Sequence, residues 1–105
     1  MPTGEELRQA QRNLWTAVAE GWERWDGWFT SQSKDLIAWF CRAVDAKPGM
    51  RILDLACGAG QPARTIAPLL LPGGRVVATD ISPEMLAVAT RKVHAEGLDL
   101  SLIHI

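Results

Sequence analysis

The stretch Arg51-Ile52-Leu53-Asp54-Leu55-Ala56-Cys57-Gly58-Ala59-Gly60 decides how this chain folds. Its apolar first part predicts a buried strand that stops at the acidic Asp54 and then runs into glycines. Because glycine has no Cβ, such a turn lets the backbone come close to a ligand. A second apolar run, residues 75–79, ends at Asp80, and a carboxylate there accepts two hydroxyl hydrogen bonds well. The two strand ends together predict a pocket for a nucleoside.

Outward from this stretch, strands and helices alternate. The pattern predicts strands at residues 51–56, 75–79 and 99–105 and helices at residues 61–71 and 83–96. Strands that alternate with helices of this length favour a right-handed βαβαβ arrangement with a parallel sheet of order 3-2-1, hence an α/β fold with the three-layer architecture of Rossmann-like domains. Ser82 before Pro83 is typical of a helix start, whereas Pro68 is expected to kink or shorten its helix.

The first third of the chain is helical and aromatic. Apolar side chains recur at spacings of three and four, which places them on one stripe of a helix. They are Trp15, Val18, Trp22, Trp25 and Phe29. We expect a break at Gly27 and at residues 30–31, followed by a second amphipathic helix over residues 33–44. The stripe is predicted to be buried core, with a lid over a substrate pocket as the alternative.

The glycine turn fits two cofactor classes. Gly58-x-Gly60-x-x-Ala63 formally satisfies the dinucleotide fingerprint, with Asp80 placed to hold a ribose, so an NAD(P)-dependent oxidoreductase is an alternative. Against it, Asp54 precedes the glycines, a long helical segment precedes the strand, and Gln61-Pro62 replaces the expected turn. A carboxylate repels a nearby pyrophosphate but attracts an α-amino group and a sulfonium.

Two segments carry a family resemblance, namely Leu53-Asp54-Leu55-Ala56-Cys57-Gly58-Ala59-Gly60 and Asp80-Ile81-Ser82-Pro83-Glu84-Met85-Leu86. They resemble the class I S-adenosylmethionine-dependent methyltransferases, in particular the small-molecule branch that includes the ubiquinone and menaquinone C-methyltransferases. The resemblance covers residues 47–97. It implies a Rossmann-like methyltransferase fold, S-adenosyl-L-methionine as the cofactor and methyl transfer to a small-molecule acceptor, which the sequence does not identify.

The resemblance also implies roles for individual residues. Gly58 and Gly60 would let the backbone approach the methionine part of the cofactor, and Asp54 would support that turn and its ammonium contacts. Asp80 would accept the two ribose hydroxyls, and Ile81 would pack on the adenine. No residue is assigned as a general base, so the catalytic residues stay unknown.

At Ala56, a further expected cofactor-binding position, the family more often has glycine. The sequence halts inside the third predicted strand, where such a sheet normally continues, and residues 100–105 look like an in-frame reading of a transposon-end sequencing adapter. We therefore expect an N-terminal fragment truncated after the third parallel strand, with a helical segment at residues 1–46 and a partial cofactor-binding α/β domain at 47–105. A native third strand is the alternative. We expect the fragment itself to be inactive, and an inactive truncated remnant is a further reading of the function.

Composition narrows the partners. The chain has 11 Lys and Arg against 12 Asp and Glu, a net charge of −1, and no basic stripe, which argues against a nucleic-acid partner. No apolar stretch reaches the roughly 18 residues of a membrane span and no signal peptide is evident, so we expect a cytoplasmic protein. Neither Cys41 and Cys57 nor His94 and His104 have metal-ligand spacing, and no metal site is predicted. The sequence leaves the oligomeric state unspecified.

Overall fold

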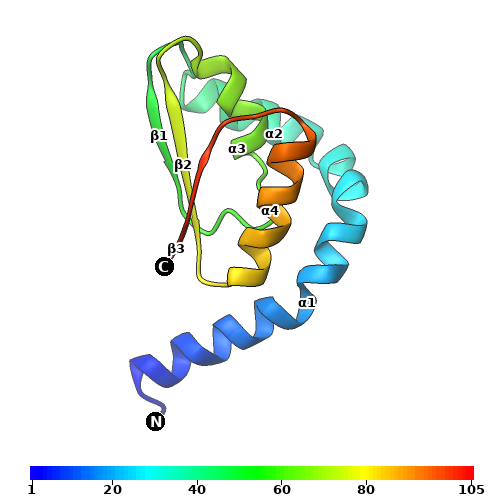
Figure 1. Cartoon of the computed structure of the whole chain (residues 1–105), viewed down its shortest axis with the longest axis vertical. Coiled ribbons are helices and arrows are strands. Elements are labelled where there is room, and N and C mark those ends of the chain that lie inside the picture. Colours follow the sequence, from blue (N-terminus) through cyan, green and yellow to red (C-terminus); the bar gives the residue numbers. More distant parts are fainter.

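The computed structural model describes all residues, 1–105, as one parallel sheet with helices packed against it (Figure 1). The elements in chain order are α1 (Gly4–Gln32), α2 (Lys34–Ala43), β1 (Arg51–Asp54), α3 (Ala63–Ile66), the 3₁₀ helix η1 (Ala67–Leu70), β2 (Arg75–Asp80), α4 (Pro83–Ala95) and β3 (Ser101–His104). The strands pair in the order β1-β2-β3. The predicted α/β fold, the parallel sheet with β2 in the middle, and the two leading helices are confirmed.

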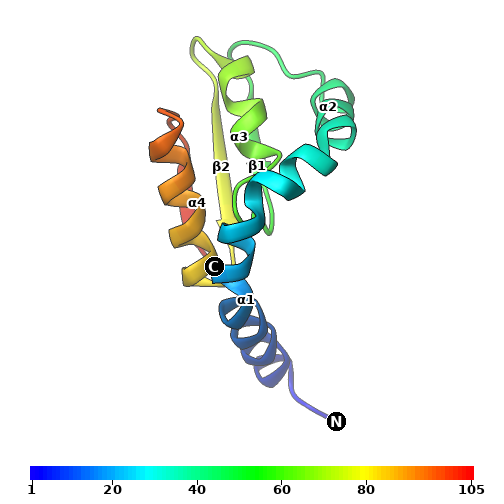
Figure 2. The ribbon, with the colours of Figure 1, turned by 90° about the vertical axis from the view of Figure 1, so that its right-hand side faces the viewer.

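The helices lie on one side of the sheet, as the two orthogonal views show (Figures 1 and 2). Both crossovers, through α3 and η1 and through α4, step in the same direction along the sheet, and right-handed crossovers of that kind place their helices on the same face. The other face is bare, with Leu53 61% and Ile103 47% exposed. The structure is therefore two-layered, and the expected three-layer architecture is wrong for this chain. A second layer of helices on the other face requires a reversal of the strand order, and this sheet has none.

The core lies between β2 and the helices that cover it. Val76 and Ala78 of β2 are fully buried, and Leu70 at the end of η1 packs in the same cluster. A smaller cluster joins Met85 and Val88 of α4 to Ala19 of α1. The second cluster fixes the long helix α1 against the α/β unit, and so it determines where the N-terminal helices stand relative to the strand ends.

Helix α1 runs further than predicted. It begins at a capping box, in which the Thr3 side chain accepts from the Glu6 backbone N–H and the Glu6 carboxylate accepts from the Thr3 N–H, and it continues through Gly27 to Gln32. The break expected at Gly27 and at residues 30–31 is wrong, because the helix ends only after Gln32. A single interior glycine costs only about 1 kcal/mol relative to alanine, which the docking of α1 on α4 outweighs.

The predicted burial of the aromatic stripe is also wrong. Only Trp22 is half-buried, while Trp25 is 55% exposed and Trp15, Val18 and Phe29 are exposed as well. The helix meets the rest of the chain through small and polar residues of another face, such as Ala19 and Asp26. Periodicity identifies an apolar face but not what covers it, and here no element of the chain lies over most of it.

The two proline positions behave as expected. Helix α3 gives way to the tighter η1 at Ala67, next to Pro68, so the helix expected over residues 61–71 is split. The Ser82 hydroxyl accepts from the Met85 backbone N–H at 3.2 Å and caps α4, with Pro83 in its first turn. Capping by Ser82 fixes the start of α4 directly after the last residue of β2.

Gly74 stands where the chain enters β2. A Cβ at this position would lie against the backbone oxygens of Leu70 and Met50, so only glycine fits. The Gly74 N–H donates to the Leu70 oxygen at 2.8 Å, and the next residue, Arg75, donates to the Met50 oxygen at 3.0 Å. From there the pairing runs Arg51 with Arg75 through to Asp54 with Ala78.

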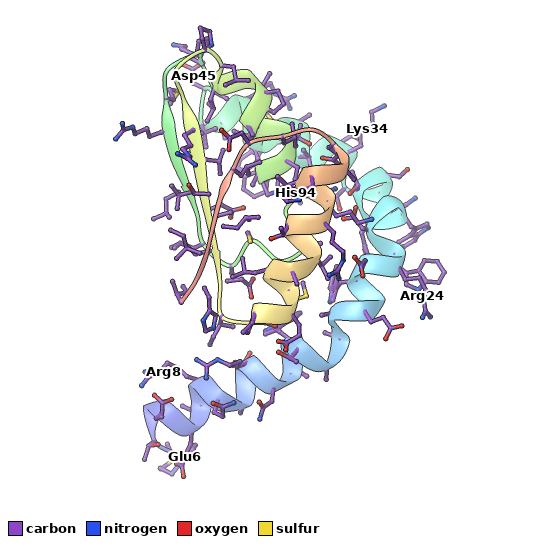
Figure 3. All side chains as sticks on the ribbon, in the orientation of Figure 1. Glu6, Arg8, Arg24, Lys34, Asp45 and His94 are labelled. Atoms are coloured by element: carbon purple, nitrogen blue, oxygen red, sulfur yellow. The ribbon has the colours of Figure 1, made fainter.

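Charged side chains are found over the surface of the protein (Figure 3). The labelled side chains of Glu6, Arg8, Arg24, Lys34 and Asp45 point away from the body of the protein (Figure 3). No helix combines the length and the apolar character that crossing a membrane would require.

The bare sheet face leads to a first prediction. Because β1 is an edge strand and Leu53 is exposed on it, we expect the chain to self-associate through this surface. Leu53→Lys should lower the weight-average mass in sedimentation velocity at a fixed concentration. Leu7→Lys, at an equally exposed leucine near the start of α1, is the matched control and should leave the mass unchanged. Equal effects of the two variants would contradict the assignment to the sheet.

Candidate functional site

The turn after β1 is tied to the end of β2 by backbone hydrogen bonds. The Cys57 N–H donates to the Thr79 oxygen at 2.8 Å, and the Gly60 N–H closes the turn onto the Cys57 oxygen at 2.9 Å. The Gly58 N–H donates to Oδ2 of Asp80 at 2.9 Å. The glycine turn and the acidic strand end predicted from the sequence therefore meet directly.

Asp80 is held rigidly. The residue is 6% exposed, and while Oδ2 accepts from the Gly58 backbone N–H, Oδ1 accepts from the Ser82 backbone N–H at 2.9 Å. Each carboxylate oxygen has more than one acceptor site, so both retain the capacity to accept a hydroxyl. A carboxylate fixed in this way can accept two neighbouring hydroxyls without losing side-chain freedom on binding.

Asp54 carries one of the buried polar atoms without a hydrogen-bond partner in this region. Its Oδ2 is buried and has no hydrogen-bond partner. Burial, and secondarily the charge of Asp80, raise the pKa of Asp54 to about 6. A buried carboxylate beside a second carboxylate is stabilised by a cation that approaches both. These hydrogen-bond acceptors therefore fit the ammonium and sulfonium of S-adenosylmethionine together with the hydroxyls of its ribose.

The backbone of the turn is left-handed at three positions. Gly58 and Gly60 have φ of +56° and +109°, and Ala56 has φ of +58°. Glycine adopts these values freely, whereas an L-residue pays about 1–2 kcal/mol in the left-handed region. At Gly60 an added Cβ would also approach the Cδ of Arg64 to 3.0 Å. Ala56 is thus a strained position in the predicted cofactor turn.

This strain predicts a stabilising substitution. Ala56→Gly should raise the free energy of unfolding by about 0.5–1 kcal/mol, because relief of the left-handed strain exceeds the added flexibility of the unfolded chain. Thermal unfolding followed by circular dichroism measures it. Ala59→Gly, in the same turn but without a positive φ, should instead lower the midpoint. A fall in the midpoint for both variants would show that Ala56 is not strained.

The surroundings of Cys57 disfavour a nucleophilic thiolate. The side chain is buried in the main core, and burial, then the charges of Asp54 and Asp80, raise the pKa of its thiol to about 12. The thiol therefore stays protonated near neutral pH, where a cysteine nucleophile needs to be a thiolate. No cluster of His, Cys, Asp or Glu is placed to hold a metal ion.

A cleft of about 470 Å³ opens at this edge of the sheet. Of the six predicted cofactor residues, Ala56, Gly58, Asp80 and Ile81 line it, whereas Asp54 and Gly60 are not among its lining residues. The cleft is within the size range of small-molecule sites. The structure thus brings the turn and the acidic strand end to one cavity.

The opposite side of the cleft is an aromatic and aliphatic wall that the helices α1 and α2 supply. Its members are Trp15, Trp22, Phe29, Leu36, Ile37 and Phe40. Trp22 and Phe29 are stacked, with ring centroids 4.5 Å apart. Three of these residues belong to the stripe that was expected in the core, so the lid alternative describes their position better.

Sequence reasoning missed several residues at the site. Asp26 of α1 lines the cleft and pairs with the buried Arg64 of α3, and the hydroxyl oxygen of Thr30, also in the lining, is buried without a partner. The only signal in the sequence is that Arg64 interrupts an apolar helix. A single charged residue in a helix does not reveal its partner, because that partner is remote in sequence.

Comparisons with known proteins agree on the family. The model of a family described as "Methyltransferase domain" matches residues 52–105, about half of the chain. A demethylmenaquinone methyltransferase from Symbiobacterium thermophilum is 33% identical over 106 residues, which is 90% of this chain and 38% of that protein. One from Thermus thermophilus is 43% identical over 70 residues, covering 64% of this chain and 31% of the relative.

Solved structures give the same result. The structure titled TrmN from Thermus thermophilus superposes with a TM-score of 0.62 at 34% identity, over 67% of this chain and 21% of that one. A protein-L-isoaspartate O-methyltransferase gives a TM-score of 0.60 at 27% identity, over 66% of this chain and 22% of that chain. The chain spans less than two fifths of the length of these relatives. With its three-stranded α/β unit and the matched family model, the chain belongs to the class I S-adenosylmethionine-dependent methyltransferase family.

Proposed function

We propose that this chain binds S-adenosylmethionine at the carboxyl ends of β1 and β2 and presents the methyl group to a small apolar acceptor held against α1 and α2. The observation that carries the proposal is the cleft itself, which places Gly58 and Asp80 opposite a wall of apolar side chains. Residues 47–105 would hold the cofactor, and residues 1–46 would cover it. The oxidoreductase alternative gains no support from the relatives.

The residues would act by placement. The two hydroxyls of the ribose would bind to Asp80, and the ammonium would lie near Asp54, whose buried oxygen has no other partner. When bound, the cofactor supplies a methyl group made electrophilic by the adjacent sulfonium. The contribution of the protein is therefore proximity and alignment, which need a fixed turn and a fixed wall rather than an acid or a base.

The aromatic wall of the cleft indicates which class of acceptor would bind there. Trp22 and Phe29 offer stacked ring faces, and the demethylmenaquinone methyltransferases among the relatives point to an aromatic ring compound. The fold by itself does not separate acceptors, because a structure titled as a putative rRNA-methylase from Clostridium thermocellum shares it at a TM-score of 0.56 and 31% identity. The volume of the cleft and the net charge of −1 favour a small molecule.

The cofactor is tested by calorimetric titration. S-Adenosylmethionine and S-adenosylhomocysteine should each bind with a dissociation constant in the low-micromolar range or tighter, and NAD⁺ and NADP⁺ should give no heat of binding. Preferential binding of a dinucleotide would overturn the proposal and support the oxidoreductase alternative.

The acceptor class is tested separately by fluorescence. A soluble 1,4-naphthoquinone should quench the tryptophan emission of the chain saturably, and Trp22→Leu should weaken this quenching more than the matched Trp28→Leu, which lies outside the cleft. Saturable binding of a short RNA in place of the quinone would reject the small-molecule acceptor.

A further inference from the structure

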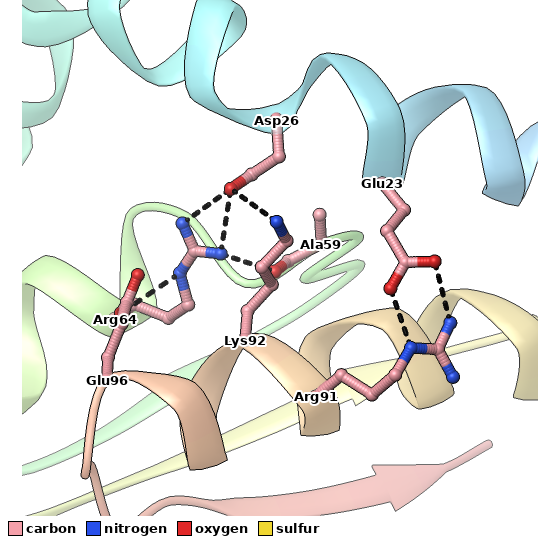
Figure 4. Close-up of polar contacts among 7 residues, drawn as sticks. All are labelled: Glu23, Asp26, Ala59, Arg64, Arg91, Lys92 and Glu96. Carbon is pink, nitrogen blue, oxygen red and sulfur yellow. Dashed lines mark hydrogen bonds and ion pairs between the residues drawn. The ribbon is translucent and has the colours of Figure 1, made fainter.

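Arg64 is the most deeply buried charged side chain of the site region, with 2% of it exposed. Its guanidinium donates to Oδ2 of Asp26 from both terminal nitrogens, Nη1 at 3.1 Å and Nη2 at 3.0 Å. Nη1 also donates to the backbone oxygen of Ala59 at 3.2 Å. Figure 4 shows that this one side chain reaches helix α1 and the glycine turn at the same time.

The surroundings hold Arg64 in this position. Nε lies 3.5 Å from a carboxylate oxygen of Glu96, just beyond α4, and Nζ of Lys92 lies 3.8 Å from Oδ2 of Asp26 (Figure 4). The aliphatic part of Arg64 packs against Gly60, with Cδ 3.0 Å from the position that a Cβ of Gly60 would take. A buried guanidinium is costly to leave unpaired, so its partners on α1 and in the turn cannot move independently of it.

Asp26 links this contact to the aromatic wall. On α1 it lies one helical turn after Trp22 and nearly one turn before Phe29, and all three residues line the cleft. A helix segment held at Asp26 therefore holds the stacked pair of rings on either side of it. The Ala59 oxygen, on the other side of Arg64, belongs to the turn that contains Gly58 and Gly60.

We infer that Arg64 is a positioning residue that couples the glycine turn to the aromatic wall of the cleft. When a ligand orders the turn, the Ala59 oxygen, Arg64 and Asp26 transmit this order to α1. The inference rests on the proposed function, because it takes the turn to be the cofactor site and the wall to be the acceptor site. Coupling of this kind is reciprocal, so occupancy of the wall also favours the cofactor site.

The test uses a background in which the three tryptophans that do not line the cleft, Trp25, Trp28 and Trp39, are replaced by phenylalanine. The remaining Trp15 and Trp22 both line the cleft. The ligand is S-adenosylhomocysteine, and the two readouts are its dissociation constant by calorimetry and the quenching of tryptophan emission by acrylamide. In the background chain, saturating ligand should reduce the quenching constant about twofold, because an ordered wall admits less quencher.

In Arg64→Lys, which keeps the charge but not the forked geometry, we expect the dissociation constant to rise roughly five- to tenfold and the ligand to leave the quenching constant unchanged. Asp26→Asn should behave likewise. The matched control is Arg91→Gln. It breaks an exposed ion pair with two hydrogen bonds between Arg91 of α4 and Glu23 of α1, the helix that also carries Asp26. It should keep the ligand response and bind within twofold of the background, although it lowers the unfolding midpoint slightly.

Hydrogen exchange of the unsubstituted chain provides a measurement that does not depend on the variants folding. S-Adenosylhomocysteine should slow amide exchange in the turn and also in residues 22–30 of α1. Protection of the turn alone, or a full ligand response in a folded Arg64→Lys chain, would overturn the coupling while leaving the cofactor site intact. Failure of the unsubstituted chain to bind S-adenosylhomocysteine would instead reject the proposed function, and the coupling with it.

Discussion

Asp80→Ala is expected to weaken the binding of S-adenosylhomocysteine by about 1–3 kcal/mol, which is roughly a 5- to 150-fold rise in the dissociation constant. Two ribose hydroxyls would lose a charged acceptor, and charge-assisted hydrogen bonds are the stronger kind. The backbone N–H groups of Gly58 and Ser82 would lose their partner too, which loosens the turn. Calorimetric titration below the unfolding midpoint of each variant measures the change.

A second substitution separates charge from shape. Asp80→Asn keeps one carbonyl acceptor and should lose less affinity than Asp80→Ala. Asp99→Ala removes an exposed carboxylate remote from the cleft lining and is the matched control, with no expected change. If both Asp80 variants bind the ligand as tightly as the unsubstituted chain, then Asp80 is a turn residue and the ribose assignment fails.

Asp54→Asn should stabilise the free protein and weaken its ligand binding at the same time. The pKa of Asp54 is raised from 3.8 to about 6, so in the folded state the carboxyl group resists ionisation. Its contribution to the free energy of unfolding is fully present below pH 4, falls as the pH rises, and is lost above about pH 6. The neutral asparagine avoids this loss.

The expected gain at pH 7.5 is about 1–2 kcal/mol. A shift of about two units corresponds to about 3 kcal/mol, which is reduced here because the side chain is only partly removed from solvent. Thermal unfolding between pH 4 and pH 8 is the measurement. The difference between Asp54→Asn and the unsubstituted chain should be small at pH 4 and grow through pH 6, whereas Asp99→Asn should show no such trend.

The ligand response of this variant has the opposite sign. An amide cannot replace a carboxylate beside an ammonium, so Asp54→Asn should bind S-adenosylhomocysteine about tenfold more weakly at pH 7.5. Opposite effects on stability and on ligand affinity are expected where a charge destabilises the free protein but binds the ligand. A variant that is stabilised and still binds as tightly would show that Asp54 is a structural burden with no part in recognition.

Sequence patterns were sufficient for the half of the structure that depends on local signals. The strand ends at Asp54 and Asp80 and the cap at Ser82 follow from apolar runs, glycines and capping chemistry, which act over a few residues. The topology followed as well, since right-handed crossovers leave few arrangements of short βαβ units. For these reasons the position of the glycine turn beside Asp80 could be predicted.

The rest depends on packing between distant segments. The exposed stripe of α1 and the aromatic wall both depend on which face of that helix meets α4, and periodicity contains no information on this choice. The partnership of Asp26 and Arg64 likewise spans 38 positions. The left-handed conformation of Ala56 was not predicted, because alanine itself does not indicate it and the only signal is the glycine that the family more often has at this position.

Gly74 determines at which residue β2 begins, and therefore which side chains of that strand face the cleft. Side chains alternate between the two faces of a strand, so a slip of one residue at the start of β2 would turn Asp80 toward the bare face of the sheet and bring Thr79 to the cleft side. The contacts of Gly74 with Leu70 and Met50 prevent that slip from the far end of the strand. A single-residue insertion or deletion between η1 and β2 that shifts the pairing of β2 would therefore abolish the proposed recognition of a ribose while leaving every residue of the cleft unaltered.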